Sequence, residues 1–312
     1  MKHYLTLNDL TSIETAIQEA MALKSDPYKY KYLGAQKTLV MLFFNASLRT
    51  RLSTEKAAKH LGMEVIVLNV TDSWQLEFEA GVVMNLESSE HVKEAAQVIS
   101  QYADILAVRA FPSLKNKEKD QSEWILTSFV KYATVPVVNM ESATGHPLQA
   151  LADAITIEEL KTKKTPKVVL SWAPHPKALP HAVANSFIEM MQASDVNFSI
   201  VHPQGYDLDP NIVKETPVSY LQDKALESAD FVYVKNWSNY QAYGEVTSQD
   251  ASWMMTKQKL GSAIFMHCLP VRRNVVVEDA VLDSEQSAVI KQSNNRTYAA
   301  QLVLKKILEN EE

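Results

Sequence analysis

Hydroxyl and guanidinium side chains are concentrated in the stretch Ser47-Leu48-Arg49-Thr50-Arg51, which follows an apolar run at residues 38–44. The apolar run is typical of a buried parallel strand, and a helical pattern follows at about residues 50–61. Backbone N–H groups at a helix N-terminus lack intrahelical partners, and an arginine fork matches the oxygens of phosphate. The stretch therefore predicts a phosphate site. The alternative that it leaves open is a capped helix with two solvated arginines.

Four further polar stretches end predicted strands or open predicted helices. They are Val108-Arg109, His146-Pro147-Leu148-Gln149, the run from His267 to Asn274, and Asn294-Asn295-Arg296. Ligands of open α/β sheets bind beyond the carboxyl ends of the strands, so we expect these stretches to meet at one site. Each has a structural alternative: Arg109 could pair with a carboxylate, His146 could cap a helix, and Cys268 could be a buried small side chain. The pattern puts Arg296 at a helix start, where the macrodipole favours anions, which indicates a shared anionic ligand.

Helix and strand patterns alternate along the whole chain, which predicts an α/β fold with two doubly wound parallel sheets. Strands are expected at residues 37–44, 64–70, 103–110 and 135–140, and then at 167–172, 197–201, 229–234 and 263–268. Helices are expected from a cap at Asn8 to residue 24, and at 91–102, 123–132, 147–161, 179–193 and 294–310. The predicted domains are residues 1–142 and 143–293, with a C-terminal helix at 294–312 that packs back on the first domain.

The composition excludes several classes of protein. A net charge of −6 over 312 residues argues against a nucleic-acid-binding surface. The N-terminus has no apolar run of signal-peptide length, and no stretch reaches the length of a membrane span. The single cysteine fits a reducing cytoplasm. Eight histidines without ligand spacing predict no metal site, and the seven glycines do not form the fingerprint of a dinucleotide site. We therefore expect a cytoplasmic protein without a cofactor, metal, membrane or nucleic-acid partner.

Taken together, the motifs resemble the aspartate/ornithine carbamoyltransferase family. Ser47-Leu48-Arg49-Thr50-Arg51 is similar to its Ser-Thr-Arg-Thr-Arg phosphate motif, and His146-Pro147-Leu148-Gln149 to its His-Pro-x-Gln motif. His267-Cys268-Leu269-Pro270 is similar to the ornithine branch. The resemblance covers the full chain and implies carbamoyl phosphate as the donor. It also implies a homotrimer with active sites at subunit interfaces, in which Trp74 reaches a neighbouring site.

One loop separates this chain from the ordinary ornithine branch, whose Asp-x-Trp-x-Ser-Met-Gly loop binds a free α-amine. The corresponding stretch here begins with Lys235-Asn236-Trp237 and holds no aspartate, which suits an acylated and therefore uncharged nitrogen. Glu141, residues 172–176 and residues 269–274 likewise resemble the N-acylornithine carbamoyltransferases. That resemblance implies a knotted second domain.

The resemblance also implies roles for the site residues. The δ-amine of an acylornithine would attack the carbamoyl carbon and expel phosphate without a covalent enzyme intermediate. Thr50, Arg109, His146 and Gln149 would bind the carbamoyl group. The carbonyls of Cys268 and Leu269 would orient the amine. A Cys268 thiolate nucleophile is the disfavoured alternative. The set implied for carbamoyl phosphate is Ser47, Leu48, Arg49, Thr50, Trp74, Arg109, His146, Gln149 and Arg296. The set implied for the acylornithine is Ser89, Glu90, Glu141, His175, Lys235, Cys268, Leu269 and Arg272.

In the acylornithine subfamily that this chain resembles, one position before the helix at about residue 91 separates the acyl groups. Glutamate accompanies acetylornithine there, and proline accompanies succinylornithine. Alignment places Ser89 at this position, which favours N-succinyl-L-ornithine, whereas a shift of one residue would place Glu90 there and favour N-acetyl-L-ornithine. Two further functions stay open: ordinary ornithine carbamoyltransferase, and a non-catalytic relative that binds carbamoyl phosphate. Gly145 and Ala184 depart from the pattern of the subfamily, which has arginine and proline there, and Gly145 would loosen the turn before His146.

Overall fold

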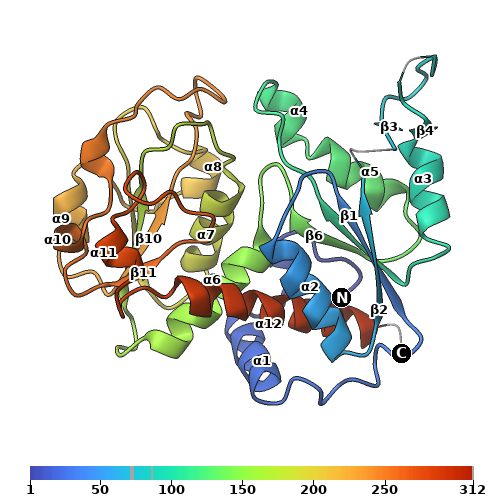
Figure 1. Ribbon diagram of the computed structural model, residues 1–312, viewed down its shortest axis with the longest axis horizontal. Coiled ribbons are helices and arrows are strands. Elements are labelled where there is room, and N and C mark those ends of the chain that lie inside the picture. Colours follow the sequence, from blue (N-terminus) through green and yellow to red (C-terminus); the bar gives the residue numbers. More distant parts are fainter. Residues whose placement is uncertain (71–73, 86, 311–312) are drawn as a thin grey trace. The chain divides into compact units, whose positions relative to one another are not determined.

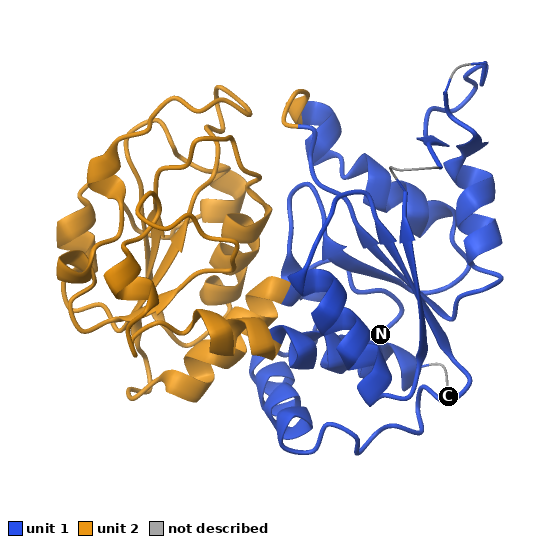
Figure 2. Ribbon diagram, in the orientation of Figure 1, with its two compact units in different colours: residues 1–113, 118–148, 296–312 blue, residues 114–117, 149–295 orange. Residues whose placement is uncertain are grey.

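The computed structural model describes residues 1–70, 74–85 and 87–310 and divides the chain into two compact units (Figures 1 and 2). Unit 1 comprises residues 1–113, 118–148 and 296–312, and unit 2 comprises residues 114–117 and 149–295. Three of the four changes from one unit to the other fall inside helices. They lie after Lys117 in α4 (Lys117–Gln121), after Leu148 in α6 (Pro147–Leu160) and before Arg296 in α12 (Val289–Leu308).

The described residues of unit 1 form a four-stranded sheet with the strand order β2-β1-β5-β6, and its pairings are all parallel. The central strands are almost wholly buried because their sequences are continuous apolar runs. Valine and leucine side chains of β1 and β5 pack with α3 and α5, and Phe129 is fully buried there. The strands are β1 (Thr38–Phe43), β2 (Glu64–Asn69), β5 (Ile105–Arg109) and β6 (Val137–Glu141). The other elements are α1 (Ile13–Ser25), α2 (Arg49–His60), β3 (Leu76–Glu77), β4 (Glu90–His91), α3 (Val92–Ile99), α4 (Lys117–Gln121) and α5 (Trp124–Tyr132).

The first helix begins later than the sequence predicts. Residues Leu7–Asp9 form a separate 3₁₀ turn, η1, because the Asp9 carboxylate accepts hydrogen bonds from the backbone of Leu5 and Thr6. Helix α1 is capped by Ser12, whose hydroxyl oxygen accepts from the backbone N–H of Thr15. The prediction of a cap at Asn8 is therefore wrong.

The last helix begins earlier than predicted, at Val289 and not at Asn294. The backbone N–H of Gln292 already donates to the carbonyl of Ala288, so the polar residues before Asn294 belong to the helix. Arg296 consequently lies about two turns inside α12. The argument from the helix macrodipole does not apply to it, because that effect is confined to the first turn.

The described part of unit 2 forms a five-stranded parallel sheet with the order β11-β10-β7-β8-β9. The edge strand β9 (Val218–Ser219) was not predicted, because two residues are too short to give a periodic pattern. The other strands of this sheet are β7 (Lys167–Trp172), β8 (Asn197–Val201), β10 (Phe231–Lys235) and β11 (Ile264–Met266). The helices are α7 (Ala182–Gln192), α8 (Pro210–Val213), α9 (Gln222–Leu226), η2 (Ala251–Trp253), α10 (Lys257–Leu260) and α11 (Asp279–Leu282). Over the described residues, no helix combines the length and apolar character needed to cross a membrane.

Two loops of unit 2 that follow neighbouring strands are hydrogen-bonded to each other. The indole N–H of Trp172 donates to the carbonyl of Trp237 over 3.1 Å, and the side chain of Asn236 donates to the carbonyl of Ala173 over 2.7 Å. The backbone N–H of Ser238 also donates to Leu179. These bonds fix the segments that carry His175 and Lys235. The knot remains a prediction.

Candidate active site

The predicted phosphate stretch lies where expected, at the turn between β1 and α2 in unit 1. The hydroxyl oxygen of Ser47 accepts a hydrogen bond from the backbone N–H of Thr50 over 3.3 Å. Leu48 is 66% exposed, and Arg49 is half-buried in the first turn of α2. A cavity of about 430 Å³ adjoins the turn and is lined by Ser47, Leu48 and Arg51 among others. The turn thus presents backbone and hydroxyl donors beside an open volume.

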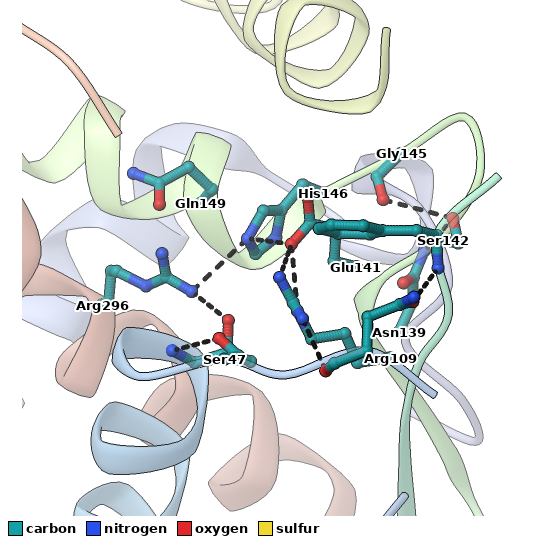
Figure 3. Close-up of polar contacts among 12 residues, drawn as sticks. Ser47, Arg109, Asn139, Glu141, Ser142, Gly145, His146, Gln149 and Arg296 are labelled. Atoms are coloured by element: carbon teal, nitrogen blue, oxygen red, sulfur yellow. Dashed lines mark hydrogen bonds and ion pairs between the residues drawn. The ribbon is translucent and has the colours of Figure 1, made fainter. Parts of the chain in front are cut away.

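Arg296 joins this turn to the start of α6. Its guanidinium donates to the hydroxyl oxygen of Thr50 over 2.6 Å. The same guanidinium lies 3.4 Å from Nε2 of His146 (Figure 3). The three side chains are all at least 94% buried. A charged donor, a hydroxyl and an imidazole from α12, α2 and the residue before α6 therefore meet inside unit 1.

Arg109 and Glu141 lie opposite each other at the ends of β5 and β6. The Glu141 carboxylate accepts from Nε of Arg109 over 3.2 Å and lies 3.1 Å from its Nη2. Nη1 of Arg109 donates to the carbonyls of Asn45 and Ala46, each over 2.8 Å. Arg109 therefore forms the ion pair with a carboxylate that the sequence left open as its structural alternative. It also fixes the backbone of the turn between β1 and α2, which we call the phosphate turn.

His146 lies between these charged groups. The same oxygen of Glu141 is 3.5 Å from its Nε2. Burial holds the pKa of His146 well below the ordinary value of 6.5, and the neighbouring charges of Arg296 and Arg109 lower the pKa further. The imidazole is therefore neutral near pH 7. A neutral ring with one N–H is suited to donating a hydrogen bond to a carbonyl oxygen.

In unit 2, Gln149 belongs to a buried network of side chains. Its amide donates to Oδ1 of Asp153 over 2.6 Å, and Nε2 of Gln292 donates to the same oxygen over 2.7 Å. The other end of the Gln292 amide accepts from the backbone N–H of His267 over 3.0 Å. Nδ1 of His267 accepts from the backbone N–H of Leu269 over 2.8 Å. The network thus links Gln149 to the loop of Cys268, which is itself buried and lies just beyond β11.

The remaining residues predicted to bind the acylornithine in unit 2 form two local contacts. Lys235 is buried at the end of β10, and its ammonium donates to the carbonyl of Asn236 over 2.7 Å. Nε of Arg272 donates to Nε2 of His175 over 3.1 Å. Burial is the largest of several causes that lower the pKa of His175, and the nearby charges of Arg272 and Lys235 act in the same direction. A neutral His175 is consistent with its role as an acceptor from Arg272.

Comparisons with known proteins identify the family of the chain. The family model of the carbamoyl-phosphate-binding domain of aspartate/ornithine carbamoyltransferases matches residues 2–159, and the model of the aspartate/ornithine-binding domain matches residues 180–307. The chain belongs to the aspartate/ornithine carbamoyltransferase family. A crystal structure of an N-acetyl-L-ornithine transcarbamylase variant superposes on this carbamoyltransferase with a TM-score of 0.90 at 33% identity, covering 98% of this chain and 100% of the other. The predicted fold class is thereby confirmed.

The sequence identity of this carbamoyltransferase to its relatives differs among the branches of the family. It is 49% identical to an N-succinylornithine carbamoyltransferase of Bacteroides fragilis, with 99% of each chain covered. It is 34% identical to an N-acetylornithine carbamoyltransferase of Xanthomonas axonopodis, with 97% and 96% covered. It is 30% identical to an ornithine carbamoyltransferase of Cupriavidus metallidurans, with 99% and 97% covered. The predicted resemblance to the acylornithine enzymes is thereby confirmed.

Sequence reasoning missed Asp153, which is fully buried and binds both Gln149 and Gln292. A signal for it exists, because a carboxylate four residues after Gln149 on one helix lies on the same face. Over the described residues, no group of three or more histidine, cysteine or carboxylate side chains is arranged to hold a metal ion.

The neutral His146 leads to a prediction about acid stability. The folded protein binds no proton at His146 near pH 6, whereas the unfolded chain does, so the free energy of unfolding falls as the pH drops below about 6.5. One such group costs about 1.4 kcal/mol per pH unit once its unfolded form is fully protonated. We expect His146→Gln to reduce the slope of the unfolding free energy against pH by the contribution of about one proton, between pH 6 and pH 5. Urea unfolding at several pH values measures this slope. An unchanged slope would mean that His146 is charged in the folded protein.

Proposed function

We propose that this carbamoyltransferase transfers the carbamoyl group of carbamoyl phosphate to the δ-amine of N-succinyl-L-ornithine. The products are N-succinyl-L-citrulline and phosphate, and the reaction belongs to arginine biosynthesis. The observation that carries the proposal is the 49% identity, over nearly the full length of both chains, to an enzyme named for the succinyl substrate. The corresponding identity to an enzyme named for the acetyl substrate is 34%.

The donors of the phosphate turn and Arg296 would hold the phosphate of carbamoyl phosphate. Its dianion suits a combination of backbone N–H groups, hydroxyls and guanidinium groups. The residues proposed for this contact are Ser47, Leu48, Arg49, Thr50 and Arg296, joined by Trp74 of a neighbouring subunit. The pairing of Arg296 with Thr50 over 2.6 Å supports this assignment, because it keeps a cation at the helix start.

The carbamoyl oxygen would be held by Thr50, Arg109, His146 and Gln149. Attack by the neutral δ-amine converts the carbonyl into a tetrahedral oxyanion, and donors aimed at that oxygen lower the barrier. One such donor is typically worth about 3–4 kcal/mol. The neutral state of His146 supports its role, because the ring then carries one N–H as a donor and one acceptor nitrogen.

The carbonyls of Cys268 and Leu269 would orient the attacking amine. The new C–N bond forms in the tetrahedral oxyanion, and the carbamoyl C–O bond to phosphate then breaks. The leaving phosphate takes the proton that the amine nitrogen gives up. No enzyme nucleophile is needed, so Cys268 acts through its backbone. Glu141, His175, Lys235 and Arg272 would bind the amino-acid part, with the two cations suited to its α-carboxylate.

The acyl group depends on which of two adjacent residues, Ser89 or Glu90, lies at the acyl position. The indole N–H of Trp74 donates to Oε2 of Glu90 over 2.8 Å within one chain, whereas Ser89 is exposed. The Glu90 carboxylate is thus engaged by Trp74 of its own chain. This pairing supports Ser89 as the residue at the acyl position. A neutral serine would not repel the carboxylate of a succinyl group.

Solved relatives support the same interpretation. Three structures of N-acetyl-L-ornithine transcarbamylase, in which one glutamate is replaced by valine, alanine or proline, contain carbamyl phosphate and N-succinyl-L-norvaline. Replacing that glutamate is thus compatible with a succinyl ligand in this fold. A serine at position 89 fits that series.

We further propose that the enzyme is a cytoplasmic homotrimer with a knotted second domain. Leu48 and Leu52 are 66% and 59% exposed beside the phosphate turn, and Val83 is 75% exposed after β3. Exposed apolar side chains next to a binding site are typical of surfaces covered by a partner. A neighbouring subunit would cover them and bring Trp74 to the site.

The test of the proposed function is the formation of citrulline-type products with three acceptors side by side. These are N-succinyl-L-ornithine, N-acetyl-L-ornithine and L-ornithine, each with carbamoyl phosphate. We expect turnover of the succinyl compound. Turnover of the acetyl compound alone would place Glu90 at the acyl position. Turnover of ornithine alone would mean that the protein is an ordinary ornithine carbamoyltransferase. No turnover with intact binding of carbamoyl phosphate would support a non-catalytic relative.

A further inference from the structure

His146 is carried by a short turn at residues 142–145, between β6 and α6. The turn contains Gly145 immediately before His146, and glycine gives a backbone more freedom than any other residue. A side chain that must meet a carbamoyl oxygen at hydrogen-bond distance needs a fixed backbone, since a displacement of about 1 Å can cost 100-fold in rate. Something must therefore hold this turn.

The turn is held by the carboxylate of Glu123, which lies at the N-terminus of α5. Oε1 of Glu123 accepts from the hydroxyl of Ser142 over 2.7 Å, from the backbone N–H of Thr144 over 2.7 Å and from the Thr144 hydroxyl over 2.5 Å. Oε2 accepts from the backbone N–H of Ala143 over 3.1 Å. Four donors from three consecutive residues thus converge on one carboxylate, and ionised acceptors make the stronger hydrogen bonds.

The backbone of Glu123 is strained to make this contact. Its φ of 53° and ψ of 35° lie in the left-handed region, which costs a residue with a side chain about 1 kcal/mol or more. In this conformation the carboxylate makes no cap bond to its own helix and instead binds the turn after β6. The strain is thus offset by the contacts to Ser142, Ala143 and Thr144.

The turn is also stabilised by hydrogen bonds between its own residues. The backbone N–H of Ser142 donates to the carbonyl of Gly145 over 2.8 Å, and the Ser142 hydroxyl oxygen lies 3.2 Å from the same carbonyl oxygen (Figure 3). The side chain of Asn139, on β6, donates to the hydroxyl oxygen of Ser142 over 3.0 Å. Glu123 and Asn139 therefore both act on Ser142, and Ser142 holds the carbonyl of the residue that precedes His146.

We propose that Glu123 is a positioning residue for His146, acting through the turn at residues 142–145. It touches neither substrate nor the reacting atoms. Its carboxylate compensates for the freedom of Gly145 and keeps the imidazole where it meets the carbamoyl oxygen. The inference rests on the proposed function, because it assigns the turn a part in that reaction.

The test compares Glu123→Gln and Glu123→Ala with Glu118→Gln, an exposed glutamate nearby in α4. The alanine variant loses all four bonds, and we expect kcat to fall by about 10- to 100-fold with little change in the KM of either substrate. The glutamine variant keeps an acceptor oxygen for the three bonds to Oε1 but turns a donor toward Ala143. It should therefore lie between wild type and Glu123→Ala, and Glu118→Gln should match wild type.

A double-variant cycle separates positioning from a general loss of stability. In a His146→Ala background there is no imidazole to position, so we expect Glu123→Ala to have no further effect on kcat. An equal loss of kcat in both backgrounds, or wild-type kcat in a folded Glu123→Ala protein, would overturn the proposal. The imidazole signals of His146 in NMR spectra, assigned by their loss in His146→Ala, should shift in Glu123→Ala but not in Glu118→Gln. Because this readout needs no turnover, it remains decisive even if the wild type uses none of the three acceptors and the proposed function fails.

Discussion

Replacing Arg296 with methionine is expected to weaken the binding of carbamoyl phosphate by about 100-fold or more. A hydrogen bond to a charged group is worth about 1.5–3 kcal/mol, and a guanidinium group donates at least two such bonds to a phosphate. Every 1.4 kcal/mol corresponds to a tenfold change in affinity. The buried position of Arg296 strengthens the effect, because little water is present to replace the lost donors. The measurement is the KM and the dissociation constant of carbamoyl phosphate.

Two further variants make this prediction specific. Lys59→Met removes an exposed cation from α2, the helix that begins at the phosphate turn, and should change binding less than twofold. Arg296→Lys keeps the charge but not the planar fork, so it should restore only part of the affinity. If Arg296→Met bound carbamoyl phosphate with wild-type affinity while remaining folded by circular dichroism, the assignment of Arg296 to the phosphate site would be wrong.

The sequence predicts the sheet of unit 1 well because its central strands are buried on both faces. Each is a short apolar run that ends in polar residues, and this pattern carries the position of Ser47 and Arg109 at the strand ends. The motifs of the site are recognisable for the same reason. They follow strands or open helices, where the connecting loops of parallel sheets gather.

The side-chain partners of the site could not be predicted in this way. Arg296 and Thr50 are 246 residues apart, and Arg109 and Glu141 are 32 apart, so no local period relates them. Glu123 has the sequence pattern of an ordinary residue at a helix start. Only the folded chain shows that its carboxylate leaves that helix and binds the turn before His146. Pairs of this kind are set by tertiary packing, which a pattern in one segment does not encode.

Replacing Arg109 with methionine is expected to affect both catalysis and stability. Loss of a donor to the carbamoyl oxygen should lower kcat by about 100- to 1000-fold. The same change leaves the carboxylate of Glu141, which is 7% exposed, without its guanidinium partner. Breaking a buried ion pair from one side costs about 3–5 kcal/mol of folding free energy, because a buried charge remains unpaired. Urea unfolding and steady-state kinetics measure the two effects separately.

The double variant Arg109→Met/Glu141→Gln distinguishes a catalytic arginine from one that only neutralises Glu141. Removing both charges relieves the unpaired carboxylate, so most of the lost stability should return. Activity should not return, because no guanidinium then faces the carbamoyl oxygen. The matched reference is Glu141→Gln alone, which has the same change at the proposed acylornithine contact and retains Arg109. If the double variant equalled Glu141→Gln in kcat, Arg109 would be only a structural partner of Glu141. Thr50, His146 and Gln149 would then polarise the carbamoyl group without it.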